Sequence, residues 1–315
     1  VTMTKTRAKY RVGIIGCGLM GTPHARAYNE NPRTEVVAAA DADPETLKQF
    51  CERFNITAGY DNYDEMLRKE EIDIVAPVLP VNANPDAVVA AAKAGVQAIF
   101  CEKPIAGILS DADRMVEECL SRNIKFACGD AFRNLPQYWD AKKISDSGNL
   151  GKVTSINLYQ STNEISGGGC QGLSLVRLFA QDSDVERVIG WVNDDPWSNA
   201  DQGMGGMIQF SNGIEAYIHR KESAKKGIEV IFESGVFYSD FHTFQMWRLD
   251  EDARQTDAQL SQLRLDMNRF PDSGIGDTKY DSNGWRVTLK RTTESIQSIV
   301  DSLETGIEPR CSGDN

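Results

Sequence analysis

Residues 11–21 read RVGIIGCGLMG and decide the fold of the first part of the chain. A short apolar run, VGII, leads directly into Gly16, Gly18 and Gly21. In such a G-x-G-x-x-G pattern the first glycine permits a tight turn from strand to helix. The second lets backbone N–H groups approach a pyrophosphate, and the third lets the helix lie close to the sheet. The stretch therefore predicts a strand, a turn and a helix that bind a dinucleotide.

An acidic residue stands at the distance from the glycines that this interpretation requires. Asp41 lies 20 residues after Gly21, at the end of a second apolar run, EVVAAAD. A carboxylate at this place accepts hydrogen bonds from the ribose hydroxyls of the adenosine, and its charge repels a 2′-phosphate. We therefore expect NAD as the cofactor, in preference to NADP.

Composition and charge exclude several other classes of protein. The 315 residues are 41% apolar and 25% charged, which is typical of a globular protein of about two domains. The formal charge is −12, so nucleic acid and anionic membranes are not expected as partners. The seven cysteines are scattered and form no C-x-x-C or Cys/His cluster, which predicts reduced thiols and no metal. Because residues 1–10 lack the apolar stretch of a signal peptide, a cytoplasmic protein is expected.

The pattern of apolar residues changes along the chain and predicts two domains. Up to about residue 130, short apolar strands alternate with helical segments of about ten residues, which predicts a doubly wound parallel sheet. After residue 150, strand-like runs follow one another and are broken by glycine or polar pairs, which predicts a large, open and mostly antiparallel sheet. We expect a Rossmann domain over 1–130 and an α+β domain for substrate binding and oligomerisation over 131–315.

A second motif, Glu102-Lys103-Pro104, follows the apolar strand AGVQAIF. In this motif and in the glycine pattern, the chain resembles the family of glucose-fructose oxidoreductase, inositol dehydrogenase and the rhizopine-catabolism dehydrogenases (Gfo/Idh/MocA). The resemblance extends over nearly the whole chain. Its further segments are Pro80-Val-Asn82, FRNLPQY at 132–138, GNLGKV at 148–153 and MIQFSNGIEAYI at 207–218.

The resemblance implies an activity and a set of site residues. Members bind NAD(P) and mostly move a hydride between nicotinamide and a secondary alcohol or ketone of a sugar or cyclitol. Lys103 is implied as the catalytic acid and base, Glu102 as a neighbour of the nicotinamide, and Asn82 as a neighbour of its ribose. A partly desolvated lysine fits this role, because oxidising an alcohol requires a base for the hydroxyl proton. The expected cofactor-binding residues are Gly16, Gly18, Leu19, Met20, Gly21, Asp41, Pro80, Asn82 and Glu102.

The second domain departs from the family pattern. Most members carry D-x-G-x-H-x-x-D at the start of a helix, where this chain has Gly167 in place of the acid and Gln171 in place of the histidine. A glutamine binds a substrate hydroxyl but carries no proton near neutral pH. We expect Gln171 to bind substrate, and Tyr159 or Glu164 are alternative proton carriers.

Three histidines remain. His24 is expected to be a packing residue of the first helix, and structural roles are favoured for His219 and His242, although His242 is kept as a further candidate proton carrier.

The sequence is compatible with three functions. The first is an NAD-dependent oxidoreductase acting on CH–OH groups of a sugar, sugar acid or cyclitol. The second is a redox-neutral enzyme that retains NAD and cleaves or isomerises a glycoside, and the third is a non-catalytic sensor of sugar or NAD. Because an open antiparallel sheet with an apolar face needs a cover, a homodimer or homotetramer through that sheet is expected.

Overall fold

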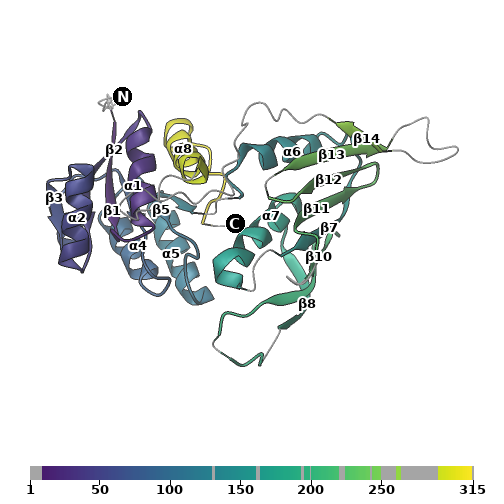
Figure 1. Cartoon of the computed structure of the whole chain (residues 1–315), viewed down its shortest axis with the longest axis horizontal. Helices are drawn as coiled ribbons and strands as arrows, with labels where there is room; N and C mark the ends of the chain where they lie inside the picture. The colour runs from purple at the N-terminus through teal and green to yellow at the C-terminus, as the bar shows by residue number, and fades with distance from the viewer. Residues whose placement is uncertain are drawn as a thin grey trace. The chain divides into compact units, whose positions relative to one another are not determined.

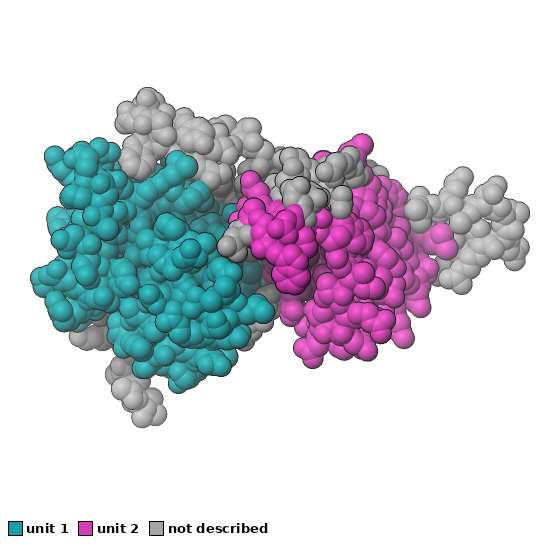
Figure 2. Space-filling view, turned by 90° about the horizontal axis from the view of Figure 1, so that it is seen from below, with its two compact units in different colours: residues 1–130, 277–314 teal, residues 131–276, 315 magenta. Residues whose placement is uncertain are grey.

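The computed structural model describes residues 9–129, 132–160, 164–192, 195–198, 200–219, 224–241, 243–249, 260–263 and 290–313. The chain divides into two compact units (Figure 2). Unit 1 comprises Val1–Asp130 and Asp277–Asp314, and unit 2 comprises Ala131–Gly276. None of the helices described is long and apolar enough to cross a membrane.

Unit 1 contains a six-stranded parallel sheet in the order β3-β2-β1-β4-β5-β6. Its first strand buries Val12, Ile14 and Ile15, so the side chains on both of its faces are covered, as is usual in parallel sheets. The expected doubly wound sheet is therefore confirmed. The strands are β1 (Tyr10–Ile15), β2 (Thr34–Ala40), β3 (Ala58–Tyr60), β4 (Ile74–Pro77), β5 (Ala98–Cys101) and β6 (Lys125–Cys128).

Helices cover both faces of this sheet (Figure 1). The first two helices pack on one face through Tyr28 and Phe50, and the next three pack on the other through Met66, Val88 and Met115. Local signals set their ends: Asp43, for example, accepts a hydrogen bond from the N–H of Thr46 and begins the second helix. These helices are α1 (Gly21–Glu30), α2 (Pro44–Phe54), α3 (Tyr63–Lys69), α4 (Asn84–Lys93) and α5 (Leu109–Ser121).

The C-terminal part of the chain returns to unit 1, whereas we expected all of 131–315 in the second domain. Helix α8 (Lys290–Thr305) contacts α1, β5 and β6, and it lies beside α1 in Figure 1. It buries Ile296, Ile299 and Val300 in the same cluster as Tyr28. The apolar face of this helix was evident in the sequence, but which sheet it covers depends on contacts between residues far apart in the chain.

Unit 2 contains an eight-stranded sheet in the order β14-β13-β12-β11-β7-β10-β9-β8. All neighbouring pairs are antiparallel except β7 with β10, which confirms the expected open and mostly antiparallel sheet. The strands are β7 (Val153–Tyr159), β8 (Val185–Val192), β9 (Met204–Phe210), β10 (Glu215–His219), β11 (Gly227–Phe232), β12 (Gly235–Ser239), β13 (Phe244–Leu249) and β14 (Leu260–Leu263).

Helices α6 (Pro136–Asp146) and α7 (Cys170–Phe179) pack on one face of this sheet. Tyr138 of α6 contacts Phe237 and Phe244, while α7 contributes Leu175 and Phe179 to the same core. A π-helical turn, η1 (Ile165–Gly169), leads directly into α7. Helix α6 was not predicted from the sequence, because its few apolar side chains give a weak helical periodicity.

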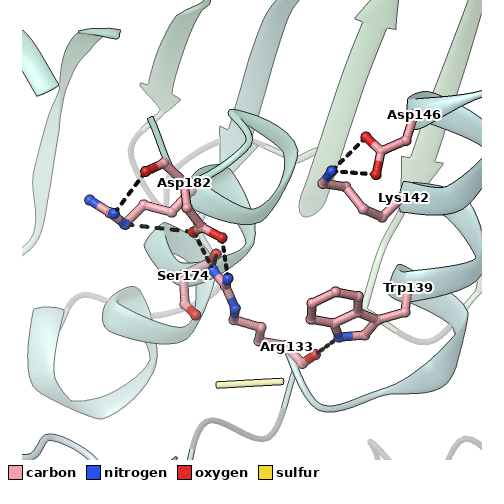
Figure 3. Close-up of polar contacts among 7 residues, drawn as sticks. Arg133, Trp139, Lys142, Asp146, Ser174 and Asp182 are labelled. Atoms are coloured by element: carbon pink, nitrogen blue, oxygen red, sulfur yellow. Dashed lines mark hydrogen bonds and ion pairs between the residues drawn. The ribbon is translucent and has the colours of Figure 1, made fainter. Parts of the chain in front are cut away.

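A buried guanidinium holds α7 in place (Figure 3). Arg133 has no exposed surface, and its two terminal nitrogens donate to the Asp182 carboxylate over 2.9 and 2.6 Å. One of them also donates to the carbonyl oxygen of Ser174 over 3.1 Å. Since Asp182 follows the C-terminal end of α7 and Ser174 lies in its first half, this one side chain fixes both parts of the helix that carries Gln171.

Removing this side chain should strongly destabilise unit 2. We expect Arg133→Ala to lower the free energy of unfolding by about 3 kcal/mol, because the partly buried Asp182 carboxylate loses two short hydrogen bonds and keeps only the ion pair with Arg177, at 3.8 Å. Arg133→Lys should recover only part of this, since an ammonium cannot make the two parallel hydrogen bonds. The measurement is urea denaturation followed by tryptophan fluorescence.

The matched control is Lys143→Ala on α6, whose ion pair with Asp140 is exposed and should contribute less than about 0.5 kcal/mol. If Arg133→Ala were no more destabilising than Lys143→Ala, the proposed role of the guanidinium would be wrong.

Candidate functional site

The glycine turn after β1 has the geometry that its three glycines predict. Gly16 has φ +98°, and a Cβ at this position would lie 2.3 Å from the carbonyl oxygen of Val78. A Cβ at Gly21 would lie 2.2 Å from the carbonyl oxygen of Gly16. At Gly18, by contrast, a Cβ would meet no atom within 4 Å. The first and third glycines are therefore required by the fold itself, whereas the second faces open space that a bound group can enter.

The N-terminus of α1 is suited to an anion. Its N-cap residue, Met20, makes no side-chain capping hydrogen bond, and the first turn contains no acidic residue. The two following helices differ, because Asp43 and Asn62 cap them. N–H groups without a side-chain cap and the helix dipole together favour a phosphate at this end. Leu19, in the loop before it, is 53% exposed. The residues present thus fit the pyrophosphate of a dinucleotide.

Asp41 follows β2 and its carboxylate is held beside the glycine turn. One oxygen accepts the N–H of Cys17 over 2.7 Å, and the other accepts the N–H of Asp43 over 2.9 Å. Each carboxylate oxygen keeps a further lone pair, so both remain able to accept hydroxyl groups. Burial and, to a lesser extent, Asp41 raise the pKa of the Cys17 thiol, which therefore stays uncharged beside the expected pyrophosphate.

The Glu102-Lys103-Pro104 motif follows β5, at the same carboxyl edge of the sheet. Asn84 organises it: the side-chain nitrogen lies 3.4 Å from the carbonyl oxygens of both Glu102 and Pro104. Its side-chain oxygen accepts the N–H of Leu79 over 3.3 Å. The backbone on either side of the half-buried Lys103 is thereby tied to the N-terminus of α4. We had not singled out Asn84, because nothing in the sequence distinguishes it from Asn82.

The other two expected cofactor residues lie in the turn before α4. Pro80 and Asn82 are exposed, and Pro80 accepts a hydrogen bond from the N–H of Ala83 through its carbonyl oxygen. The turn follows β4, which neighbours both β1 and β5 in the sheet. All nine expected cofactor residues consequently lie in the segments that follow the carboxyl ends of β1, β2, β4 and β5, with Gly21 at the start of α1.

His24 does more than fill space in α1. Its Nε2 lies 2.9 Å from Oε2 of Glu102, and its ring lies against Phe100 with 5.3 Å between the ring centres. From the sequence, His24 was expected only to be a packing residue of the first helix. The contact joins the helix after the glycine turn to the motif that contains Lys103.

In unit 2, Gln171 lies in the first turn of α7 and is 8% exposed. Its side-chain oxygen is buried and has no hydrogen-bond partner. Such an atom costs free energy unless something binds to it, so it is a candidate contact for a ligand.

Asp201 fixes the turn before Gln171. Its carboxylate accepts the N–H groups of Ile165 and Ser166 over 2.7 and 3.0 Å, at the start of η1. Desolvation of the Asp201 carboxyl raises its pKa, but hydrogen bonds from the Ser166 hydroxyl and from these N–H groups outweigh this and hold the pKa below its usual value. Sequence reasoning missed Asp201, since its partners lie about 35 residues earlier in the chain.

The carboxylate of Glu164 occupies the space where a side chain at position 167 would be. A Cβ at Gly167 would lie 2.3 Å from Oε2 of Glu164. The family pattern has an acid at position 167, and here an acid three residues earlier comes to the same place. The loss of one carboxylate is therefore accompanied by the approach of another, on the same turn that leads to Gln171.

Tyr159 is not brought to Gln171. Its neighbour Leu158 points toward α7, where it contacts Gly172, so Tyr159 points to the opposite face of the sheet. There its ring stacks on His219 at 4.5 Å, and Lys225 lies 4.6 Å from the ring centre. Tyr159 therefore lies on the face of the sheet that α7 does not cover, and its role as a proton carrier stays a prediction. His242 lies outside the described residues.

Within the part of the chain that the structure describes, no group of three His, Cys, Asp or Glu side chains could hold a metal ion. None of the described cysteines forms a disulfide bond: Cys17, Cys51, Cys101, Cys119, Cys128, Cys170 and Cys311.

Comparison with known proteins agrees with the geometry of unit 1. Residues 10–129 match the Gfo/Idh/MocA model, which describes an oxidoreductase family with an NAD-binding Rossmann fold. Among curated proteins, the D-apiose dehydrogenase of Paraburkholderia graminis is 34% identical over 133 residues, which are 42% of this chain and 35% of that protein. The myo-inositol 2-dehydrogenase of Thermotoga maritima is 29% identical over 142 residues, 45% of this chain and 42% of that protein. The matches thus cover less than half of the length of these curated relatives.

Solved structures are similar over a larger part of the chain. A levoglucosan dehydrogenase in complex with NADH has a TM-score of 0.78 and covers 97% of this chain and 92% of its own, with 17% identity. At this identity the likeness shows the fold, including that of the second sheet. Residues 10–129 of this chain are thus similar to the Gfo/Idh/MocA family of oxidoreductases with an NAD-binding Rossmann fold.

Proposed function

We propose that this protein is an NAD-dependent oxidoreductase that moves a hydride between the nicotinamide and a secondary alcohol or ketone of a sugar, sugar acid or cyclitol. The observation that carries the proposal is the open space at Gly18, beside an uncapped helix N-terminus and the fixed carboxylate of Asp41. The names of the relatives, which are dehydrogenases of apiose and inositol, support this substrate class. When bound, NAD supplies the acceptor for the hydride.

Lys103 is proposed as the group that takes and returns the hydroxyl proton. When a hydride leaves a carbinol carbon, the C–O bond becomes a carbonyl only if the hydroxyl proton leaves as well, so a base must lie at that oxygen. The support from this chain is the position of Lys103 after β5 and the anchoring of the residues on either side of it by Asn84. A fixed backbone limits the volume in which the amine moves.

Gln171 is proposed as a binding group for a substrate oxygen. Its buried and unpartnered side-chain oxygen can accept a hydroxyl proton in a hydrogen bond, and its amide nitrogen can donate. Because an amide does not ionise, it positions the substrate and carries no proton. Among the alternative proton carriers, Glu164 is favoured over Tyr159, since its carboxylate lies on the turn that leads into α7.

The open face of the sheet in unit 2 is proposed as the contact between copies of this chain. Both described helices of unit 2 that carry core residues pack on the opposite face. The open face presents Tyr217, 37% exposed, beside Met207, and Trp191, 50% exposed, over Gly205. Large aromatic side chains on a flat face are typical of association surfaces. A homodimer or homotetramer would cover them.

The first test concerns the choice of cofactor. We expect wild-type protein to bind NAD more tightly than NADP, and Asp41→Ser to reduce this preference by about 1–3 kcal/mol, because it removes a charged acceptor and a repulsion. Calorimetric titration with both dinucleotides measures it. Asp43→Asn is the control, since it removes a charge two residues away and keeps a helix cap. Equal or tighter binding of NADP by the wild type would contradict the assignment.

The second test concerns the reaction. Screening sugars, sugar acids and cyclitols with NAD should give a substrate that produces NADH, followed by its absorbance at 340 nm. With that substrate, Lys103→Met should lower kcat by about 10²–10⁴ while NAD affinity changes less than about threefold. Gln171→Ala should raise KM and lower kcat/KM by about 1–3 kcal/mol in transition-state terms. A Lys103→Met variant with near-native kcat would exclude the proposed base, and product formation without NADH would favour the redox-neutral function.

The third test concerns assembly. Light scattering coupled to size exclusion should give the mass of a dimer or tetramer, and Tyr217→Asp should reduce it, because a charge would be buried at the contact. The control is Trp197→Asp, which changes a side chain that is 90% exposed in the segment after β8. A monomeric wild type, or an unchanged mass for Tyr217→Asp, would rule out this face as the contact.

A further inference from the structure

The buried histidine of α1 and the glutamate of the Glu102-Lys103-Pro104 motif form a pair that the proposed reaction does not use. The side chain of His24 is 2% exposed and that of Glu102 is 12% exposed, and 2.9 Å separates Nε2 from Oε2. The motif approaches from the end of β5, whereas His24 lies one turn into the helix that follows the glycines. The pair is thus the point at which the glycine helix and the motif are joined by polar side chains.

The second ring nitrogen defines how the pair is protonated. Nδ1 of His24 is buried and has no hydrogen-bond partner. A proton on Nδ1 would therefore be a buried donor without an acceptor, which is unfavourable. The arrangement that leaves no donor unsatisfied has a single ring proton, on Nε2, which is donated to the Glu102 carboxylate.

A glycine allows Glu102 to occupy this position. A Cβ at Gly129, just after β6, would lie 2.9 Å from the same Oε2 that His24 contacts. The N–H of Gly129 also donates to the carbonyl oxygen of Cys101 over 2.7 Å. The carboxylate therefore lies in a space bounded by α1 on one side and the end of β6 on another, and its orientation depends on the donor that His24 provides.

The strand order indicates what Glu102 faces. In a doubly wound sheet a dinucleotide binds across the carboxyl ends of the strands, with its pyrophosphate at the turn after the first strand. Asp41 marks the adenosine side, at the end of β2, and the opposite side of β1 is formed by β4 and then β5. Glu102 follows β5 directly, so the half of the cofactor that contains nicotinamide is the half on its side.

We propose that His24 is a positioning residue for the nicotinamide half of the cofactor. It acts through Glu102, whose carboxylate it holds at the carboxyl edge of β5. This inference rests on the proposed binding of NAD in unit 1. It adds that binding of the nicotinamide half requires His24. The adenosine and pyrophosphate half depends on Gly18 and Asp41 and does not require His24, whereas the nicotinamide half does.

The test compares two ligands that differ only in nicotinamide. ADP-ribose retains the adenosine, the pyrophosphate and the second ribose. We expect His24→Leu to weaken NAD⁺ at least fivefold and to change ADP-ribose affinity less than twofold, both measured by calorimetry on the full chain. His24→Gln should stay within about twofold of wild type for both ligands, because its side-chain amide can donate where Nε2 does. His24→Asn, whose amide is too short to reach Glu102, should behave like His24→Leu and is the second variant if the leucine form does not fold.

The pathway through Glu102 is tested by combining variants. Glu102→Gln removes the charge, so adding His24→Leu to it should weaken NAD⁺ less than twofold further. Full additivity of the two changes would show that His24 acts by another route.

The outcomes separate this inference from the proposed function. Wild-type protein that binds neither ADP-ribose nor NAD⁺ contradicts NAD binding itself. Wild-type protein that binds both, with His24→Leu and His24→Asn weakening the two ligands equally, leaves NAD binding intact and shows that His24 only supports the fold. Unchanged NAD⁺ affinity in both variants overturns the inference as well.

Discussion

The close approach of two backbone segments in the glycine turn is the constraint on which the candidate cofactor site depends. The α carbon of Gly21 lies so near the carbonyl oxygen of Gly16 that a Cβ would be 2.2 Å from that oxygen. This approach lets α1 begin after a turn of five residues, with its N-terminus at the carboxyl edge of the sheet. Cys17 then presents its N–H to Asp41, so one turn sets both the phosphate end and the ribose end of the site.

Most of unit 1 could be predicted from the sequence because its signals are local. Strands such as β1 and helices such as α2 follow from short apolar runs, from Pro44 and from the capping residue Asp43. The return of α8 to this unit could not be predicted in the same way. The apolar stripe of Ile296, Ile299 and Val300 is evident in the sequence, but its partner in the fold is Tyr28, more than 260 residues away.

The candidate site was predictable to the extent that it consists of motifs. The glycines, Asp41 and the Glu102-Lys103-Pro104 segment were found from spacing and resemblance, whereas Asn84 and His24 were not recognised as their partners. Both act through hydrogen bonds to residues 18 or more positions away, and neither residue type reveals such a contact. The face of the sheet to which Tyr159 points was not evident from the sequence either, because it depends on which residues of β7 pack against α7.

The segment of unit 2 that departs from the family pattern, around Gly167 and Gln171, is held by a set of specific contacts. Gly167 leaves room that the Glu164 carboxylate takes. Asp201 accepts the N–H groups of Ile165 and Ser166, which lie between these two residues, and the buried Arg133 holds α7 itself. Two carboxylates, those of Glu164 and Asp201, and the buried amide of Gln171 are thus placed around the start of α7. Because Gln171 is a neutral amide where most family members have histidine, it carries no proton itself. It can still form a hydrogen bond to a polar ligand.

The most direct test of the central claim is a crystal structure of the protein with NAD bound. We expect the pyrophosphate over Gly18 at the N-terminus of α1, the adenosine ribose hydroxyls within hydrogen-bond distance of Asp41, and the nicotinamide on the side of Glu102. A dinucleotide bound in the reverse direction, or away from the glycine turn, would contradict the assignment of unit 1 and the roles derived from it.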